Sequence, residues 1–371
     1  MQETTQFDIV IDRRQTGAIK WDNRKNQPGL PDIIPLWVAD MDFAAPPAVL
    51  EALRKRLDHP VLGYTNPAPE YFPLLASWYR QRYGLELAGS DFLLGPAVMP
   101  AIAIAIRTFT APGDSVIIMP PVYYPFFEIN RENGRNLVEV PLLNPGPGRW
   151  DMDLVGVEAA IIRQASGPQP VRAILLSNPH NPGGRVWTRD ELLRLDQLAV
   201  RHGITVISDE IHSDIVFDPT TFTSLASPIF ANPARIVFAG PNKTFYIAGL
   251  QNVPGDLVEA AARRQLARAI AAAGFSQPNV LAYTAAHAAY SDCGPWVDDM
   301  KAYLLDNFRF LLDFLARELP EVSGYLPEAT YLAWVDFRAL IARRGFKNDA
   351  EMALLLEETG RVKISQGSIF G

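Results

Sequence analysis

Short runs of apolar, often β-branched residues constrain the fold of this chain more than any other feature. Each run is continuous and does not alternate with polar residues, which is the pattern of strands that are buried on both faces. The runs lie at residues 92–94, 115–119, 173–176, 205–208 and 235–238. We therefore predict an α/β fold, in which a mainly parallel mixed sheet is sandwiched by helices.

Amphipathic patterns between these runs predict the covering helices. Residues 47–57 place Val49, Leu50, Leu53 and Leu57 on one face. Thr188 and Glu191 form a capping box, Gly203 is a fitting C-terminal stop, and residues 297–319 have the pattern of a long helix. Residues 101–106 alternate with a period of two, as a strand does. We predict a helix there because the segment follows Pro100 and a strand candidate already precedes it.

Length and composition predict a protein of two domains. A chain of 371 residues, 48% of them hydrophobic, exceeds one typical domain and can bury a sizeable core. We predict a large domain at residues 46–290 and a small α+β domain that combines residues 1–45 with 291–371, the latter part being incomplete.

Charge and cysteine content argue against several classes of function. The net charge of −7 argues against a nucleic acid or an anionic membrane as partner. The single cysteine, Cys293, excludes an internal disulfide framework and a cysteine metal site, and no metal is predicted. The first eight residues are polar and acidic, unlike a signal peptide, and no run of about 18 apolar residues occurs. We expect a cytoplasmic protein.

Groups able to do chemistry follow the predicted strands. In an open α/β sheet, ligands bind at the carboxyl ends of the strands. Asp209 ends one run, and Lys243 follows another. An enzyme that uses pyridoxal phosphate (PLP) needs such a pair, because a lysine holds the cofactor as a Schiff base and an acid keeps the pyridine nitrogen protonated.

The other strand ends carry further groups that suit this cofactor. Residues 95–100 lead into a helix whose free amides could hold a phosphate, and Tyr123 and Tyr124 could stack on a planar ring. The segment 177–184 reads Ser-Asn-Pro-His-Asn-Pro-Gly-Gly. Each feature alone also has an ordinary structural interpretation, such as a surface lysine, a helix cap or a turn. Their joint order favours a cofactor site.

On these residues the chain resembles the fold-type I PLP enzymes of aminotransferase class I/II. Within them it is most similar to the MalY/PatB-like cystathionine β-lyase branch, the cysteine-S-conjugate β-lyases. The resemblance covers nearly the whole chain, and the Trp-Val-Ala-Asp-Met-Asp-Phe and Ser-Asp-Glu-Ile-His segments favour the lyase branch. The segments that carry it lie at residues 7–8, 12–13, 20–22, 35–43, 63–65, 121–126, 178–183, 208–214, 243–250 and 330–336.

The resemblance implies a role for several residues around the cofactor ring. Lys243 would form the Schiff base and then move the Cα proton of the substrate. Asp209 would pair with the pyridinium nitrogen, and Asn181 would hydrogen-bond the ring hydroxyl oxygen. His212 stands near that oxygen, where many relatives carry a tyrosine. Tyr123 would stack on the ring.

The resemblance also implies how the phosphate and the substrate are held. Ala97 and Val98 would offer amides to the phosphate, with Asn242 as a further donor. Tyr64 would reach the phosphate of the neighbouring subunit, which makes a homodimer the expected unit. Ala39 would lie beside the carboxylate of an amino-acid substrate.

The chain departs from the family pattern at the phosphate site. Two hydroxyl residues typically precede the lysine in the family, but here the stretch reads Gly240-Pro-Asn242. Gln251 stands where many aminotransferases have a phosphate-binding arginine. We therefore expect weaker retention of PLP than in typical relatives.

The second departure concerns the substrate carboxylate. In relatives, a segment after the Gly-x-x-Phe-Gly stretch carries an arginine that clamps this group, and the present sequence ends with that stretch, at Gly371. Three interpretations stay open. The sequence is a truncated form, which we favour, or Arg13 or Arg14 takes the role, or activity is reduced.

The leading functional hypothesis is a carbon–sulfur β-lyase that acts on L-cystathionine or a related cysteine conjugate. An aminotransferase that uses the same site is the first alternative, because the catalytic residues alone do not choose between the two outcomes. A regulatory or binding protein with little catalysis is the alternative from a different class.

Overall fold

A computed structural model describes residues 5–22, 33–146, 148–251, 256–258, 260–275 and 277–371. Its main sheet has seven strands in the order β2-β10-β9-β8-β7-β3-β4. All neighbours described in this sheet are parallel except β10, which is antiparallel to both β2 and β9. The strands are β2 Phe92–Leu93, β3 Ser115–Ile118, β4 Asn136–Glu139, β7 Val171–Ser177, β8 Thr205–Asp209, β9 Arg235–Phe238 and β10 Asp256–Val258. The predicted α/β fold with a mainly parallel mixed sheet is confirmed.

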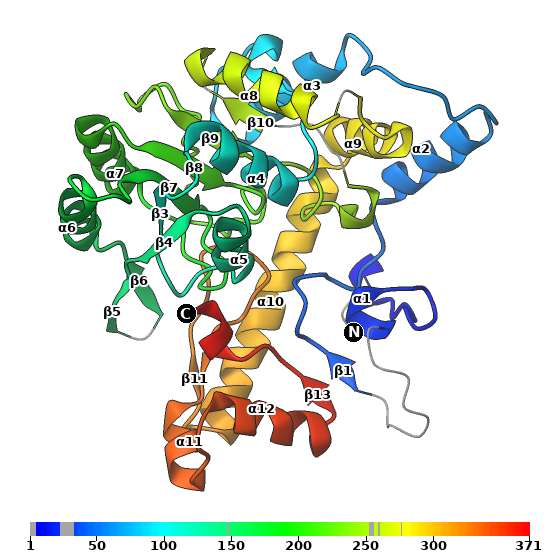
Figure 1. Ribbon diagram of the computed structural model, residues 1–371. Coiled ribbons are helices and arrows are strands. Elements are labelled where there is room, and N and C mark those ends of the chain that lie inside the picture. Colours follow the sequence, from blue (N-terminus) through cyan, green and yellow to red (C-terminus); the bar gives the residue numbers. More distant parts are fainter. Residues whose placement is uncertain (1–4, 23–32, 147, 252–255, 259, 276) are drawn as a thin grey trace.

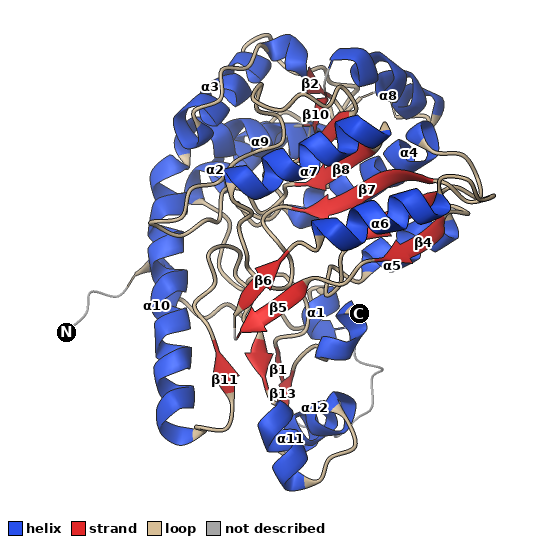
Figure 2. Cartoon of the chain, turned by 90° about the vertical axis from the view of Figure 1, so that its left-hand side faces the viewer, coloured by secondary structure: helices blue, strands red, loops and turns tan. Residues whose placement is uncertain are grey.

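Helices cover both faces of this sheet. Figure 2 shows α6 and α7 in front of β7 and β8, with α4 on the other side of the sheet. The helices of this part are α2 Pro47–Leu57, α3 Tyr71–Tyr83, α4 Val98–Phe109, α5 Pro125–Glu132, α6 Leu154–Gln164, α7 Arg189–His202, α8 Ala260–Ala272 and α9 Val280–Asp292. A hairpin of β5 Leu143–Gly146 and β6 Arg149–Asp151 precedes α6.

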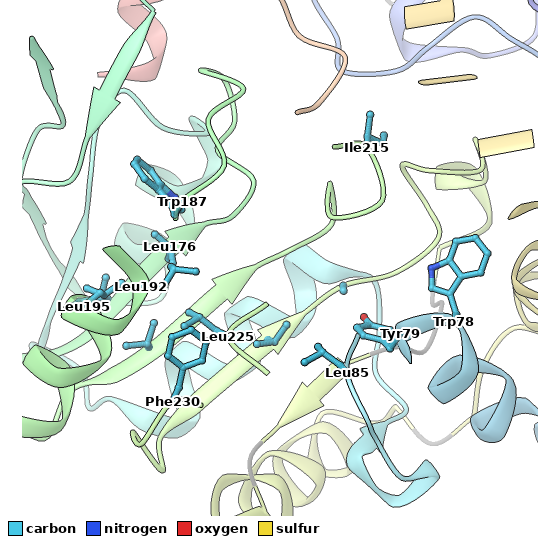
Figure 3. Packing of buried hydrophobic residues seen from close by; sticks show 14 of the residues in the cluster. Trp78, Tyr79, Leu85, Leu176, Trp187, Leu192, Leu195, Ile215, Leu225 and Phe230 are labelled. Carbon is cyan, nitrogen blue, oxygen red and sulfur yellow. The ribbon is translucent and has the colours of Figure 1, made fainter. Parts of the chain in front are cut away.

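The continuous apolar runs explain why the core divides into two clusters. Successive side chains of a strand point to opposite faces, so a strand buried on both faces feeds two cores. In β7, Ile174 and Leu176 belong to the cluster that includes Leu192 of α7, whereas Leu175 packs with the cluster that includes Ile102 of α4. Figure 3 shows Leu176 beside Leu192 in the first cluster.

The remaining elements involve both ends of the described chain. In Figure 1, the long α10 (gold) runs from the main sheet toward α11 and α12. The parallel pairing of β1 with β13 brings the N-terminal segment to residues near the C-terminus. The elements are α1 Ile19–Asp22, β1 Ile34–Pro35, α10 Gly294–Glu318, β11 Ser323–Gly324, β12 Val335–Asp336, α11 Arg338–Arg344, α12 Asp349–Glu358 and β13 Val362–Lys363. The division into domains at residues 46 and 290 stays a prediction.

Local sequence signals agree with most of these elements. The predicted helix at residues 101–106 is confirmed within α4, and the capping box of Thr188 and Glu191 starts α7. Gly203 ends α7 with φ +65°, a left-handed conformation that glycine adopts without strain. Within the described ranges, no helix is both long and apolar enough to cross a membrane.

Candidate active site

Three neighbouring strands end together and place their following loops at one edge of the sheet. Ser177 of β7, Asp209 of β8 and Phe238 of β9 are opposite one another in the register. Backbone hydrogen bonds continue just past this row, from Asn178 N to Asp209 O at 2.9 Å and from Glu210 N to Phe238 O at 2.7 Å. The loops that carry Asn181, Asp209 and Lys243 therefore start from the same edge.

A cavity of about 1370 Å³ opens between this edge and the segments outside the main sheet. Four residues predicted for the site line it: Ala39, Tyr123, Asn181 and Lys243. Tyr331, on the segment that follows α10, lines it as well. The cavity thus gathers groups from five separate parts of the sequence.

Lys243 lies in a turn after β9 and directs its amine at the N-terminal segment. Its Nζ donates a hydrogen bond to Ala39 O over 2.7 Å. Burial lowers the pKa of Lys243, while Asp40 and Asp209 act in the opposite direction. A buried lysine with a lowered pKa has a larger uncharged fraction, and only the uncharged amine can attack a carbonyl or accept a proton.

Asp209 is the buried acid of the site. Burial raises its pKa to about 6, opposed by a hydrogen bond from Ile211 N and by the charge of Lys243. Ile211 N donates to Oδ1 over 3.1 Å. The carboxylate is thus poised to pair with a cation, since a positive partner would offset the penalty of burying its charge.

His212 lies in the turn that follows β8 and Asp209, and it is held uncharged. Burial lowers its pKa to about 3, and the nearby charge of Lys243 acts in the same direction. The ring meets Tyr331 edge to face, with 5.6 Å between centroids. Among the described residues, His212 Nδ1 is buried without a hydrogen-bond partner. A buried polar atom of this kind is satisfied when a ligand or a water supplies the missing group.

His180 ties the loop of Tyr123 to the loop of Asn181. Gly183 N donates to His180 Nδ1 over 3.2 Å, so Nδ1 is the acceptor and Nε2 donates to Pro121 O over 2.8 Å. Burial raises the pKa of Tyr123 to about 12, which keeps its hydroxyl protonated. The two side chains proposed for the ring therefore come from loops that one buried imidazole connects.

The residues predicted for the phosphate lie outside the lining of this cavity. Val98 is the first residue of α4 and Ala97 is its N-cap, with no side chain capping the helix. Asn242 precedes Lys243 in the same turn, and its carbonyl accepts a hydrogen bond from Ile247 N. Tyr64 is 98% exposed. Asp209 and His212 are likewise not part of this lining, and Asn242 shares the turn of Lys243, so the phosphate role of these residues stays a prediction.

Two arginines considered for the substrate carboxylate are bound by acidic side chains. Arg13 pairs with Asp40 over 2.6 Å and with Asp42 over 2.8 Å. Arg14 pairs with Asp12 over 2.8 Å near the surface. Either guanidinium would have to leave its carboxylate before it could clamp a substrate, so a role for Arg13 or Arg14 stays an open interpretation.

Sequence reasoning missed Tyr331 as a site residue. Its hydroxyl donates to Ala39 O over 2.9 Å, so this carbonyl accepts from both Tyr331 and Lys243. Burial raises the pKa of Tyr331 well above its ordinary value. The sequence signal that could have identified Tyr331 was the segment 330–336. This segment is one of those that carry the family resemblance, but none of its residues was assigned a role.

The arrangement can hold a flat aromatic ligand that carries both an electrophilic carbon and a basic nitrogen. Lys243 offers a nucleophilic amine, and Asp209 offers an acid whose charge is stabilised by a cation. Tyr123 lines the space beside them. No group of three or more histidine, cysteine, aspartate or glutamate side chains suited to a metal occurs in the described part of the chain.

Comparison with known proteins points to PLP-dependent enzymes, whose chemistry needs such a lysine and acid. The model of the family described as aminotransferase class I and II matches residues 31–371. The chain is 38% identical to the cystathionine beta-lyase PatB of Bacillus subtilis, over 98% of this chain and 92% of that protein.

Two solved structures extend the likeness to three dimensions. The PLP-bound C-S lyase from Staphylococcus hominis has a TM-score of 0.90 at 32% identity, with 99% of this chain and 90% of that chain covered. A PLP-bound putative aminotransferase from Clostridium difficile has a TM-score of 0.91 at 33% identity, with coverage of 99% and 92%.

Proposed function

We propose that this chain, which belongs to the aminotransferase class I and II family, is a PLP-dependent carbon–sulfur β-lyase. Its substrate would be L-cystathionine or a related cysteine S-conjugate, and its products a thiol, pyruvate and ammonia. The observation that carries the proposal is the buried pair formed by the Lys243 amine and the Asp209 carboxylate at one sheet edge. The similarity to PatB and to the Staphylococcus hominis C-S lyase supports the choice of reaction.

The residues present fit PLP because two of them have pKa values shifted by burial and a third has a polar atom without a hydrogen-bond partner among the described residues. A buried carboxylate with a raised pKa suits a protonated pyridine nitrogen, and a buried amine with a lowered pKa suits the aldehyde carbon. His212 Nδ1 lacks a partner among the described residues, which suits a polar substituent on a ring. Lys243, Asp209, Asn181, His212 and Tyr123 are the residues that would hold the ring.

When bound, PLP supplies an electron sink that accepts the charge left at Cα after proton removal. Lys243 would attach the cofactor and afterwards act as the base that takes the Cα proton at Nζ. Its lowered pKa favours this role, since it increases the uncharged fraction of the amine and only the uncharged amine can accept a proton. Asp209 would keep the pyridine nitrogen protonated by pairing with its charge. The thiolate then leaves from Cβ with the electrons of the C–S bond.

The backbone around Ala39 would orient the substrate. Ala39 O holds the Lys243 amine in the described state, with Tyr331 as a second donor. Once Lys243 bonds elsewhere, the Tyr331 hydrogen bond remains and keeps this carbonyl satisfied. The turn that presents Ala39 would therefore hold its place beside the substrate carboxylate while the lysine moves.

We assign the phosphate to the N-terminal amides of α4, at Ala97 and Val98, with Asn242 and Tyr64 of a neighbouring subunit. A helix N-terminus favours an anion through its free amides and its dipole. The almost complete exposure of Tyr64 supports a role outside its own subunit. The expected unit is a homodimer in the cytoplasm, made of two-domain chains.

An aminotransferase is the second candidate, because the Clostridium difficile structure carries that description and the same carbanion can be protonated on the cofactor. The PLP-loaded protein would be incubated with L-cystathionine and no keto acid, followed by assay of pyruvate and free thiol. We expect both products in equal amounts. Turnover only after addition of a keto acid would establish transamination instead, and bound PLP with neither activity would favour a regulatory protein.

A further inference from the structure

Two residues of the lysine and acid segments have no role in the chemistry above. Thr244 follows Lys243 directly, and Asp214 lies five residues after Asp209. The Thr244 hydroxyl donates to Asp214 Oδ2 over 3.0 Å. Both side chains are buried. A hydrogen bond to a buried carboxylate is stronger than one between neutral groups, so it joins the two segments firmly.

The second oxygen of Asp214 is anchored on α3. Trp78 Nε1 donates to Asp214 Oδ1 over 2.9 Å, and the Tyr83 hydroxyl donates to the same oxygen. Asp214 thus accepts hydrogens from two residues of a helix and one of the lysine turn. A carboxylate with donors on both oxygens has a fixed orientation, and it passes that orientation to Thr244.

Aromatic packing holds the other side of the lysine turn. The Phe245 ring meets Trp78 and Tyr290 edge to face, at 5.7 and 5.8 Å between centroids. Phe245 N donates to Pro241 O over 2.9 Å and closes the turn. Trp78, part of the buried cluster drawn in Figure 3, therefore contacts both Asp214 and the turn that carries the lysine.

We propose that Asp214, acting through Thr244, is a positioning residue that fixes the spacing between the Lys243 amine and the Asp209 carboxylate. The inference rests on the proposed function, in which one rigid ring must meet both groups at once. A shift of the lysine turn by a fraction of the ring's width would break this match. Holding reacting groups in place before binding is a main source of enzymatic rate.

The test compares three substitutions of buried threonines. Thr244→Val keeps the shape and removes the donor to Asp214, whereas Thr244→Ser keeps the donor. Thr110→Val is the matched control, since Thr110 is also buried and hydrogen-bonded, to Ile106 O and Arg135 Nε, at the far end of α4. Urea unfolding of each apoprotein reports the loss of stability.

Two readouts do not depend on turnover. One is the rate at which the apoprotein reacts with added PLP at Lys243, followed by absorbance. The other is the pH midpoint of the absorbance band of the bound cofactor, which depends on the surroundings of the lysine nitrogen. At saturating PLP, kcat and KM for L-cystathionine are measured separately.

We expect Thr244→Val to slow the reaction with PLP and to lower kcat by about 10-fold or more, with KM changed by less than about 2-fold. The absorbance midpoint should shift as well. Thr244→Ser should stay within about 2-fold of the wild type, and Thr110→Val should lose stability without these changes.

Two results would overturn the proposal. One is a Thr244→Val protein with the wild-type PLP reaction rate and absorbance midpoint. The other is a Thr110→Val protein that changes both as much as Thr244→Val does. If the wild type binds PLP but releases no pyruvate, the proposed lyase function fails, and the PLP reaction rates still decide the positioning role.

Discussion

At the scale of single residues, burial acts in opposite directions on the two groups that define the site. It raises the pKa of Asp209 to about 6 and lowers the pKa of Lys243. Both shifts favour uncharged forms, and the attraction between the two groups opposes both. A cofactor with a pyridinium nitrogen would give Asp209 a closer cation and leave Lys243 free for its own chemistry.

Glu210, next to Asp209, provides a test of how burial affects stability. Burial raises its pKa to about 7, against 4.5 for the ordinary group, while hydrogen bonds that include one from Leu225 N lower it. The folded protein therefore holds this proton to higher pH than the unfolded chain. The resulting contribution to stability is present below about pH 4.5 and is lost as the pH rises through about 7.

Glu210→Gln removes this titration and should be more stable than the wild type at pH 8, by about 3 kcal/mol. At pH 4 the two proteins should have similar free energies of unfolding. Asn178 Oδ1 is buried without a partner among the described residues and lies beside Glu210, where the glutamine amide has a hydrogen to donate. Urea unfolding of both apoproteins from pH 4 to 8 measures the difference, and a difference that does not vary with pH would contradict this account.

Asn242 tests the phosphate site. Each neutral hydrogen bond missing from this site weakens binding by about 0.5–1.5 kcal/mol. Asn242→Ala removes the proposed amide donor and should weaken PLP binding by about 2- to 10-fold. Affinity for pyridoxal, which lacks the phosphate, should stay unchanged and serves as the control. The idea fails if PLP survives prolonged dialysis of the wild type at full occupancy.

The sequence revealed some of these residues and concealed others. Asp209 and Lys243 could be predicted because both follow apolar strands, and parallel strands end at a common edge. Tyr331 could not, because its hydrogen bond to Ala39 O joins residues 292 positions apart. The positions of Asp40 and Asp42 around Arg13 likewise depend on tertiary contacts between separate segments.

At the scale of elements, residues 325–331, here called the strap, lead from β11 to Tyr331 in the cavity. Gly184 O accepts hydrogen bonds from both Glu328 N and Ala329 N, each over 2.9 Å. Thr330 N donates to Ile215 O over 2.8 Å. Tyr331 follows as the last residue of the strap. Its place in the site is thus set by backbone contacts with the loops after β7 and β8.

Gly184 tests how closely the strap packs. Its φ is +63°, and a Cβ there would lie 2.5 Å from Pro327 Cβ and 2.9 Å from Ala329 O. Gly203 has nearly the same φ, +65°, with no atom within 4 Å of an added Cβ. Both alanine variants suffer the left-handed strain of about 1–2 kcal/mol. Gly184→Ala should lose about 1–3 kcal/mol more through the clash.

Urea unfolding of the two alanine variants measures this difference. Equal losses at Gly184 and Gly203 would mean that the strap moves aside at no cost. Gly184→Ala should also lower the rate of pyruvate release, since Tyr331 would be displaced, whereas Gly203→Ala should not.

Element prediction succeeded where local signals were strong. The five apolar runs became β2, β3, β7, β8 and β9, and the alternating segment at 101–106 became helix as expected. β4 was missed because Asn136–Glu139 begins and ends with polar residues. The antiparallel β10 was missed too, since its three residues give a strand signal too short to recognise.

At the scale of the whole molecule, the proposed homodimer makes each site depend on two chains. If Tyr64 serves the neighbouring site, Lys243→Ala inactivates the site of its own chain and Tyr64→Ala inactivates the site of the partner chain. In a mixed dimer of the two variants, one site carries both changes and the other carries neither. Random mixing should then recover about a quarter of the wild-type activity, because half of the dimers are mixed and each has one intact site.

The experiment requires unfolding and refolding the two variants together, with each variant refolded alone as the control. Pyruvate release from L-cystathionine is the readout. No recovery in the mixture, with normal recovery of refolded wild type, would show that Tyr64 serves its own chain.

The central claim is that Lys243 is the residue that holds PLP. Borohydride reduction fixes PLP to the lysine that bears it, and peptide mapping by mass spectrometry then identifies the position. Lys20 also lines the cavity but is paired with Asp42 over 2.5 Å, so it provides an internal comparison. We predict one PLP per chain, attached at Lys243. Attachment at Lys20 or at any other lysine, or no attachment at all, would contradict the account.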